Sequence, residues 1–226
     1  MHEGIFFINN ALRVTQLSVF SEEERYEQTL RTIKSIDEHC PNNLKFMFDS
    51  SPEPSQYMEN IANAGVTVYY GGADPQVQRL SYAGARSMAE TMSFLMFLEW
   101  FGKQDFKAKR IYKLSGRYVL NNNFVLDDPS YKDAFVFSKR CQTWMKDWQI
   151  EKAGTDKLFR LRLWHMDYSL LDTFKKELAN IMIDCMTRSI DVEHSYYKNL
   201  HTYNIVELDK IGVCGHIAPS GDSIDE

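Results

Sequence analysis

The sequence predicts an α/β fold in which a mainly parallel, Rossmann-like sheet is flanked by helices in three layers. Between residues 4 and 120, apolar strand-like runs alternate with helical segments, a pattern typical of right-handed βαβ units. Four of these runs end in polar or glycine-rich residues: Asn9-Asn10, Asp49-Ser50-Ser51, Gly71-Gly72 and Ser115-Gly116-Arg117. Because such sheets bind ligands outside the carboxyl ends of their strands, we expect a site there.

The first strand and helix have clear local patterns. GIFFIN at 4–9 is a continuous apolar run, as expected for a buried strand. The segment 21–41 predicts a helix, because Ser21 and Glu24 form a capping box and Pro41 stops the helical spacing. The same reasoning predicts strands at 44–54, 66–72 and 111–120, and helices at 55–65 and 75–101.

The second half has a mixed pattern. We expect strands at 133–140 and 157–166, helices at 172–186 and 191–201, and a strand followed by a glycine- and proline-rich tail at 204–221. No repeat or linker separates the halves, so we predict a single domain over 1–226, made of the halves 1–125 and 126–226.

Composition excludes several classes of protein. A net charge of −5 argues against general nucleic-acid binding, which depends on clustered Lys and Arg. The four cysteines form no C-x-x-C pair, and the N-terminus lacks the pattern of a signal peptide, so we expect a cytoplasmic protein. The apolar run at 92–101 is too short to span a bilayer and contains Glu99. The oligomeric state is left open.

One helical segment carries a family resemblance. RLSYAGARSMAETMSFL at 79–95 is similar to the I-S-x-x-x-Y-x-R-L helix of GT-A glycosyltransferases of the lipopolysaccharide galactosyltransferase and glycogenin type. The order of elements in the first 125 residues also resembles that family, with an acceptor-binding second half. The resemblance places Arg86 on the donor-contacting arginine and Ser115-Gly116-Arg117 on the Asp-x-Asp metal motif.

The sequence departs from the family at that motif. An Asp-x-Asp pair holds Mg²⁺ or Mn²⁺ against a diphosphate through hard carboxylate oxygens, and both carboxylates are missing here. Arg117 could neutralise the diphosphate in place of the cation, and Gly116 could let the backbone approach the phosphates. In the alternative interpretation, Arg117 belongs to an ordinary turn and is solvated or paired with Asp127 or Asp128.

The resemblance also suggests residues for the nucleoside and the donor. Asp49, Ser50 and Ser51 end the second strand, where the family recognises base and ribose, although an Asp/Ser turn before Pro52 has its own local logic. Arg79 lies on the same helical face as Arg86, but we expect a solvated side chain there.

Acidic residues of the second half could supply the base of an inverting transfer. Glu193 lies near the start of a predicted helix, and Asp167 follows a predicted strand; Asp191 is a further candidate. Acidic residues near helix starts are also ordinary dipole partners. His216 occupies the region where the family often places a metal-binding histidine, but it lacks an acidic pair. Three tryptophans could stack on a sugar or belong to the core: Trp144, Trp148 and Trp164.

These expectations combine into one functional hypothesis with two alternatives. The resemblance implies transfer of a sugar from a nucleotide-sugar, with a UDP-sugar favoured, to a glycan or lipid-linked acceptor in polysaccharide synthesis. The first alternative is a non-catalytic nucleotide- or carbohydrate-binding protein. The second is another phosphoryl- or nucleotidyl-transfer enzyme on a similar sheet. The absence of a G-x-x-x-x-G-K-[ST] loop argues against a P-loop kinase, and the absence of G-x-G-x-x-G after the first strand argues against a dinucleotide oxidoreductase.

Overall fold

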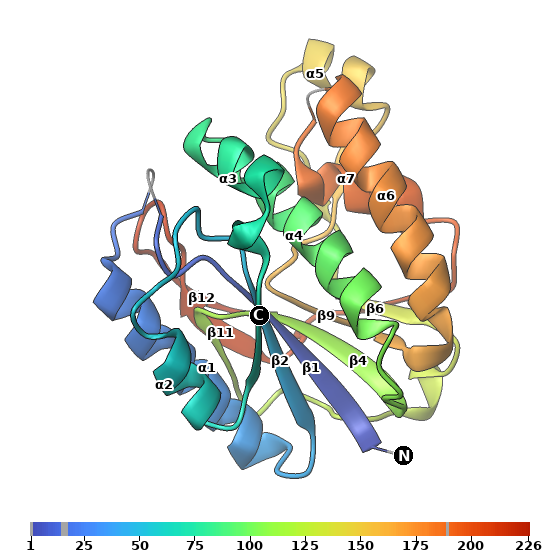
Figure 1. Ribbon diagram of the computed structural model, residues 1–226. Helices are drawn as coiled ribbons and strands as arrows, with labels where there is room; N and C mark the ends of the chain where they lie inside the picture. The colour runs from blue at the N-terminus through green and yellow to red at the C-terminus, as the bar shows by residue number, and fades with distance from the viewer. Residues whose placement is uncertain (1, 15–17, 189) are drawn as a thin grey trace.

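The computed structural model describes residues 2–14, 18–188 and 190–226, and within these ranges the fold is built on a seven-stranded sheet (Figure 1). The strands are β1 (His2–Asn10), β2 (Leu44–Asp49), β3 (Thr67–Tyr70), β4 (Ala108–Ser115), β6 (Phe135–Ser138), β9 (Leu163–Asp167) and β10 (Ile205–Leu208). Their order is β10-β6-β9-β4-β1-β2-β3, and β9 runs antiparallel to β4 and β6. The mainly parallel sheet confirms the predicted fold class.

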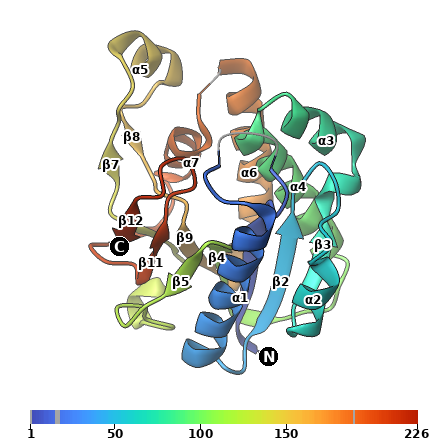
Figure 2. The ribbon, with the colours of Figure 1, turned by 90° about the vertical axis from the view of Figure 1, so that its left-hand side faces the viewer.

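Helices cover both faces of the sheet and give it three layers (Figures 1 and 2). The helices are α1 (Glu22–His39) and α2 (Met58–Asn63) on one face, with α4 (Arg86–Phe101) and α6 (Leu171–Arg188) on the other. Phe6 and Ile8 of β1 pack in the core shared with α1, whereas Ile5 and Phe7 pack in the core shared with α4. This alternation follows from the two-residue period of a strand, and explains why GIFFIN is apolar throughout.

Two predicted elements are broken in the structure. The segment 75–101 forms α3 (Pro75–Tyr82) and then α4, because Gly84 has a φ of 77° and ends the first helix. The segment 111–120 forms β4 and then β5 (Tyr118–Leu120), which belongs to another sheet. The break falls at Ser115-Gly116-Arg117, so this turn carries the chain from one sheet to the other.

The second half adds elements around the carboxyl end of the sheet. They are β7 (Cys141–Gln142), α5 (Asp147–Ala153), β8 (Lys157–Leu158), α7 (Val192–Leu200), β11 (Val213–His216) and β12 (Ser223–Asp225). Short 3-10 turns lie at Pro129–Tyr131 and Tyr168–Leu170 of this half, and at Gly71–Ala73 of the first half. β5, β11 and β12 pair antiparallel, and β7 pairs with β8. The predicted strand 157–166 is therefore divided between β8 and β9, and α5 was not predicted.

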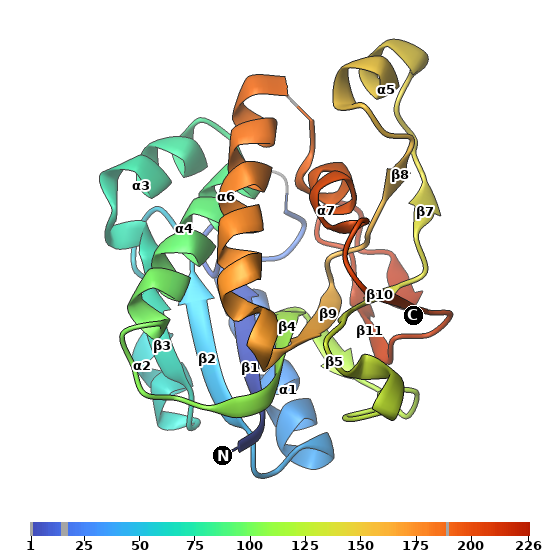
Figure 3. The ribbon, with the colours of Figure 1, turned by 90° about the vertical axis from the view of Figure 1, so that its right-hand side faces the viewer.

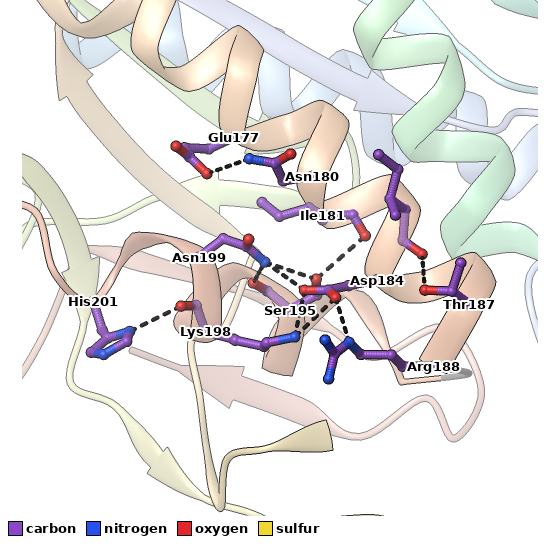
Figure 4. A network of polar contacts seen from close by, with 11 residues as sticks. Glu177, Asn180, Ile181, Asp184, Thr187, Arg188, Ser195, Lys198, Asn199 and His201 are labelled. Carbon is purple, nitrogen blue, oxygen red and sulfur yellow. Dashed lines mark hydrogen bonds and ion pairs between the residues drawn. The ribbon is translucent and has the colours of Figure 1, made fainter. Parts of the chain in front are cut away.

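Polar contacts join α6 to α7 (Figure 4). Asp184 of α6 accepts hydrogen bonds from Lys198 Nζ at 2.9 Å and from Asn199 Nδ2 at 3.0 Å, and Arg188 Nε lies 2.9 Å from it. Burial opposes ionisation of Asp184, but these partners hold its pKa below the usual value. The contacts fix α7, whose first turn lies at the carboxyl end of the sheet. In the ranges described above, every helix is too short or too polar to cross a bilayer.

Candidate functional site

A cavity of about 570 Å³ opens at the carboxyl ends of β1 and β4 and the loop after β2. Asn10 from β1, Ser50 after β2 and Ser115 from β4 lie on its wall. The start of α4 and the first turn of α7 form other parts of the lining. Of the residues predicted from the sequence, this cavity brings together Ser50, Arg86, Ser115, Arg117, Trp144, Asp191 and Glu193.

Arginines crowd one side of this cavity. Arg25, Arg86 and Arg117 all line it. Burial, followed by the charges of Arg117 and Arg86, lowers the pKa of Arg25 to about 9, although Asp49 acts in the opposite direction. Burial and Arg117 also lower the pKa of Arg86. Because like charges at short range repel, these three side chains favour an anion between them.

The guanidinium groups are held in different ways. Arg25 is fixed from behind, because its Nη1 donates to Ala11 O at 2.9 Å and its Nη2 donates to Ser18 Oγ at 3.0 Å. Arg117 lies with its Cζ 5.7 Å from the centre of the Tyr118 ring, and among the described residues its buried Nε has no hydrogen-bond partner. The proposed alternative partners of Arg117 are engaged elsewhere: Asp127 with Arg110, and Asp128 with Ser130.

Lys113 adds a buried cation that the sequence analysis did not select. It lies on β4, and its Nζ donates to Leu161 O at 2.8 Å and Ser115 Oγ at 3.3 Å, with Glu90 Oε1 at 3.5 Å. Burial lowers the pKa of Lys113, and Glu90 acts against that shift. The available signal in the sequence was a lysine among apolar residues of a predicted strand. A charge in such a strand is buried only when it has specific partners.

Gly116 serves the packing of the turn. Its N–H donates to Asn9 O at 2.9 Å, and its carbonyl accepts from Thr29 Oγ1 at 3.2 Å. A Cβ at this position would lie 3.0 Å from Asn10 Nδ2. Gly116 is buried and does not line the cavity. The glycine therefore allows the turn to approach β1, which differs from the predicted approach of its backbone to phosphates.

Asp49 and Ser51 brace the loops behind the cavity. Asp49 is fully buried, and its carboxylate accepts from Leu12 N at 3.0 Å and Ser51 N at 2.8 Å. Ser51 Oγ accepts from Arg13 N at 3.0 Å. Burial raises the pKa of Asp49 despite these donors. The geometry gives both residues a bracing role in place of the predicted direct contact with a nucleoside.

Replacing Asp49 by alanine should lower the free energy of unfolding by about 3 kcal/mol, because two buried N–H groups lose their acceptor. Urea denaturation of the purified variant measures this loss. The control is Asp37→Ala, which removes a half-exposed surface carboxylate and should cost less than about 1 kcal/mol. Equal stability of the two variants would remove the bracing role.

Two acidic residues line the same cavity as the arginines. They are Asp191 and Glu193, at the start of α7, and Arg162 also lines the cavity. Burial, then the charge of Asp191, raises the pKa of Glu193, while Arg162 and the Leu161 N–H act in the opposite direction. A carboxylate with a raised pKa in a cavity is suited to accepting a proton.

Asp167 lies at the opposite end of the sheet. Because β9 is antiparallel to β4, Asp167 pairs in register with Arg110, near the start of β4. It lines a different cavity, of about 620 Å³, together with Asp127 and Ser169. Its carboxylate accepts from Ser169 N at 3.0 Å. Asp167 was predicted as an alternative to Glu193 because it follows a predicted strand, and the antiparallel direction of β9 places it in the other cavity.

The residues at the end of β4 do not fit a divalent cation. Ser115 Oγ accepts from Lys113, and Arg117 places a positive charge beside it. His216 lines a separate groove, with Arg117 and Ser223, and its Nδ1 lies 3.2 Å from Gly221 O. Among the described residues, no group of three or more His, Cys, Asp or Glu side chains could hold a metal ion. Hard cations require several oxygen ligands, and this donor set is cationic instead.

The three-layer architecture, with its cavity at the ends of β1 and β4, is that of the GT-A glycosyltransferase fold. The galactosyltransferase LgtC, solved in complex with donor and acceptor sugar analogues, superposes with a TM-score of 0.50 at 9% identity, over 86% of this chain and 69% of that one. Mouse xyloside xylosyltransferase 1, in its apo form, gives a TM-score of 0.48 at 7% identity, over 92% of this chain and 84% of that one.

A third solved structure is a glycosyltransferase involved in glycosylation of the major capsid of PBCV-1, with a TM-score of 0.44 at 9% identity, over 91% of this chain and 82% of that one. The scan against protein-family models gives no match. The search of curated proteins gives none either. At this level of identity, the likeness to LgtC establishes the fold, and the function has to be argued from the site.

Proposed function

We propose that the protein is a glycosyltransferase that moves a sugar from a nucleotide-sugar, with a UDP-sugar favoured, to a hydroxyl group of a glycan or lipid-linked acceptor. The observation that carries the proposal is the crowding of Arg25, Arg86 and Arg117 in a cavity that Glu193 also lines. A diphosphate would relieve the repulsion among the arginines through charge-assisted hydrogen bonds.

The arginines and Glu193 match the two demands of sugar transfer, which are to stabilise the leaving diphosphate and to accept the proton of the acceptor. In an inverting reaction, the acceptor oxygen forms a bond to the anomeric carbon while the bond from that carbon to the diphosphate oxygen breaks. The electron pair of the broken bond stays on the diphosphate, where Arg117 and Arg86 would stabilise the added charge. The acceptor proton would pass to Glu193, whose raised pKa makes it a stronger base than an ordinary carboxylate.

The same residues favour neutralisation of the diphosphate without a divalent cation. Arginine presents a planar fork of donors that matches phosphate oxygens and stays charged at neutral pH. Arg117 occupies the strand end at which the family resemblance places the second aspartate, and Lys113 reaches Ser115 from the same strand. We therefore propose that Arg117 takes over the electrostatic role of the cation.

The second candidate is a protein that binds a nucleotide or a carbohydrate without turnover. The absence of a carboxylate pair at Ser115-Gly116-Arg117 favours it, since the chemistry could have been lost with that pair. For the transferase, we further propose a place in polysaccharide or lipopolysaccharide synthesis. The four cysteines, all free thiols, favour the reducing environment of the cytoplasm.

Hydrolysis of a panel of nucleotide-sugars, measured with and without EDTA, tests these proposals. We expect the purified protein to release UDP from at least one UDP-sugar, at a rate that EDTA changes less than about twofold, because arginine needs no cation. Loss of turnover in EDTA would reject the substitution of arginine for the metal and leave the transferase proposal standing. Tight UDP binding without any turnover would favour the second candidate.

A further inference from the structure

An arm of the second half projects beyond the central sheet beside α7. It comprises residues 141–158, in which β7 and β8 pair and α5 forms the tip (Figures 1 and 3). The arm includes Trp144 and Trp148, which are 67% and 63% exposed, whereas Trp164 of β9 is fully buried. The two arm tryptophans differ in one respect: Trp144 lines the cavity described above and Trp148 does not.

Trp144 lines the cavity next to the first turn of α7. Its ring meets the buried ring of His194 edge to face, with centroids 5.5 Å apart. Asp191 and Glu193 line the same cavity from the adjoining first turn of α7. A large, mostly exposed indole at the mouth of a polar cavity offers a flat apolar surface that nothing in the described chain covers.

A chain of polar contacts through the buried His194 holds the backbone next to Trp144. The Thr143 hydroxyl lies 2.6 Å from His194 Nε2, and His194 Nδ1 lies 2.7 Å from Asp191 Oδ1. Met145 N donates to Thr143 Oγ1 at 2.9 Å, which leaves the Thr143 hydroxyl proton for His194. Thr143, directly before Trp144, is thus tied to the helix turn that carries Glu193, and Met145, directly after it, is tied to Thr143. These contacts hold the backbone of Trp144 beside that turn.

We propose that Trp144 forms an acceptor subsite, in which a neutral sugar ring stacks on the indole and presents a hydroxyl group to Glu193. This inference rests on the proposed glycosyltransferase function, since it assigns the acceptor to the Glu193 side of the same cavity. Aromatic rings bind the apolar face of a flat ligand, while nearby carboxylates accept hydrogen bonds from its polar edge.

The charge of the arm favours a neutral carbohydrate over an anionic lipid surface. Residues 141–158 contain three lysines and three carboxylates, so their formal charges cancel: Lys146, Lys152 and Lys157 against Asp147, Glu151 and Asp156. Segments that bind anionic membranes through their charge carry an excess of Lys and Arg. A stacking surface without net charge is suited to a sugar ring.

Saturation-transfer NMR tests the subsite directly. The probes are the methyl β-glycosides of galactose, glucose and N-acetylglucosamine, each added to the full protein in saturating UDP. We expect at least one glycoside to bind, and Trp144→Ala to weaken that binding about tenfold, as lost aromatic stacking allows. Trp144→Phe should restore most of the affinity. Trp148→Ala removes an equally exposed indole from the same arm and should bind like the wild type.

The outcomes distinguish failure of the proposed acceptor subsite from failure of the proposed transferase function. If the wild type binds UDP but none of the glycosides, or if Trp144→Ala and Trp148→Ala behave alike, the subsite is rejected and the transferase proposal survives. If the wild type neither binds UDP nor hydrolyses any nucleotide-sugar, the proposed function itself fails. Binding to vesicles of phosphatidylcholine and phosphatidylglycerol that depends on Trp144 would replace the sugar by a lipid surface and also reject the subsite.

Discussion

Replacing Arg117 by alanine should raise the dissociation constant for UDP about 100-fold, which corresponds to about 2.7 kcal/mol. Arg117 lines the cavity from the end of β4, and its Nε is buried with no partner among the described residues. A diphosphate would supply that partner, and charge-assisted bonds to a desolvated guanidinium are among the strongest polar contacts. Isothermal titration calorimetry with UDP measures the effect.

The fold should survive this substitution. Arg117 adds repulsion to Arg25 and Arg86, as its effects on the pKa values of both show. Its removal relieves that repulsion, so the melting temperature should stay the same or rise. A loss of UDP binding in a variant that stays folded would then come from the missing contact and not from unfolding. Arg117→Lys should recover only part of the affinity, because an ammonium group lacks the planar fork of donors.

Arg79→Ala is the matched control. Arg79 is exposed on α3 and does not line the cavity, yet its removal changes the net charge of the protein by the same amount. UDP affinity should change less than about twofold in this variant, since exposed charges are screened by salt. If both variants weaken UDP binding equally, the effect comes from overall charge. If neither does, Arg117 does not contact the diphosphate.

The sequence correctly predicted those helices and strands whose formation depends on neighbouring residues in the chain. The capping box of Ser21 and Glu24 is present at the start of α1. The central sheet follows from apolar runs whose alternate side chains face two cores. The helix over 75–101 was wrong at one point, because a glycine can sit inside a helix or end it. Gly84 ends it here, with a positive φ.

The site residues at the ends of parallel strands could be predicted from the sequence. The positions that depend on how distant strands pair could not. The ends of β1 and β4 carry the expected polar residues, because parallel strands direct their carboxyl ends to one edge. Asp167 was misplaced because strand direction is set by long-range pairing with β4. Asp49 has the residue type of a ligand contact, but only the folded loops show that its oxygens are taken by Leu12 and Ser51.

Two basic residues were missed for a similar reason. Arg25 lies within the predicted helix 21–41, where no pattern singled it out, yet it is 2% exposed in the structure. Lys113 is hidden within an apolar strand and is 3% exposed. Long cationic side chains can be buried when carbonyl and hydroxyl acceptors surround them, and such acceptors come from outside the helix or strand that carries the cation, as Ala11 and Ser18 do for Arg25 and Leu161 does for Lys113.

Glu193→Gln should lower kcat for sugar transfer about 1,000-fold, because the amide cannot accept the acceptor proton. Glutamine keeps the size of the side chain, so the effect should appear in kcat. The dissociation constant for UDP should stay the same, because we expect it to depend on Arg86 and Arg117. Steady-state transfer assays together with UDP calorimetry measure the two quantities. Asp167→Asn is the control, because that carboxylate lies in the other cavity and should leave kcat within about twofold of the wild type.

The pH dependence identifies the base more sharply than the loss of rate. A base must be ionised, so kcat/KM should fall as the pH drops through the raised pKa of Glu193. Burial is the larger cause of that raised pKa and Asp191 the second, so Asp191→Asn should move the acid limb to lower pH while the limb itself persists. Asparagine can still accept from His194 N, where Asp191 caps α7. An acid limb that stays in place in Asp191→Asn, or that survives unchanged in Glu193→Gln, would assign the proton transfer to another group.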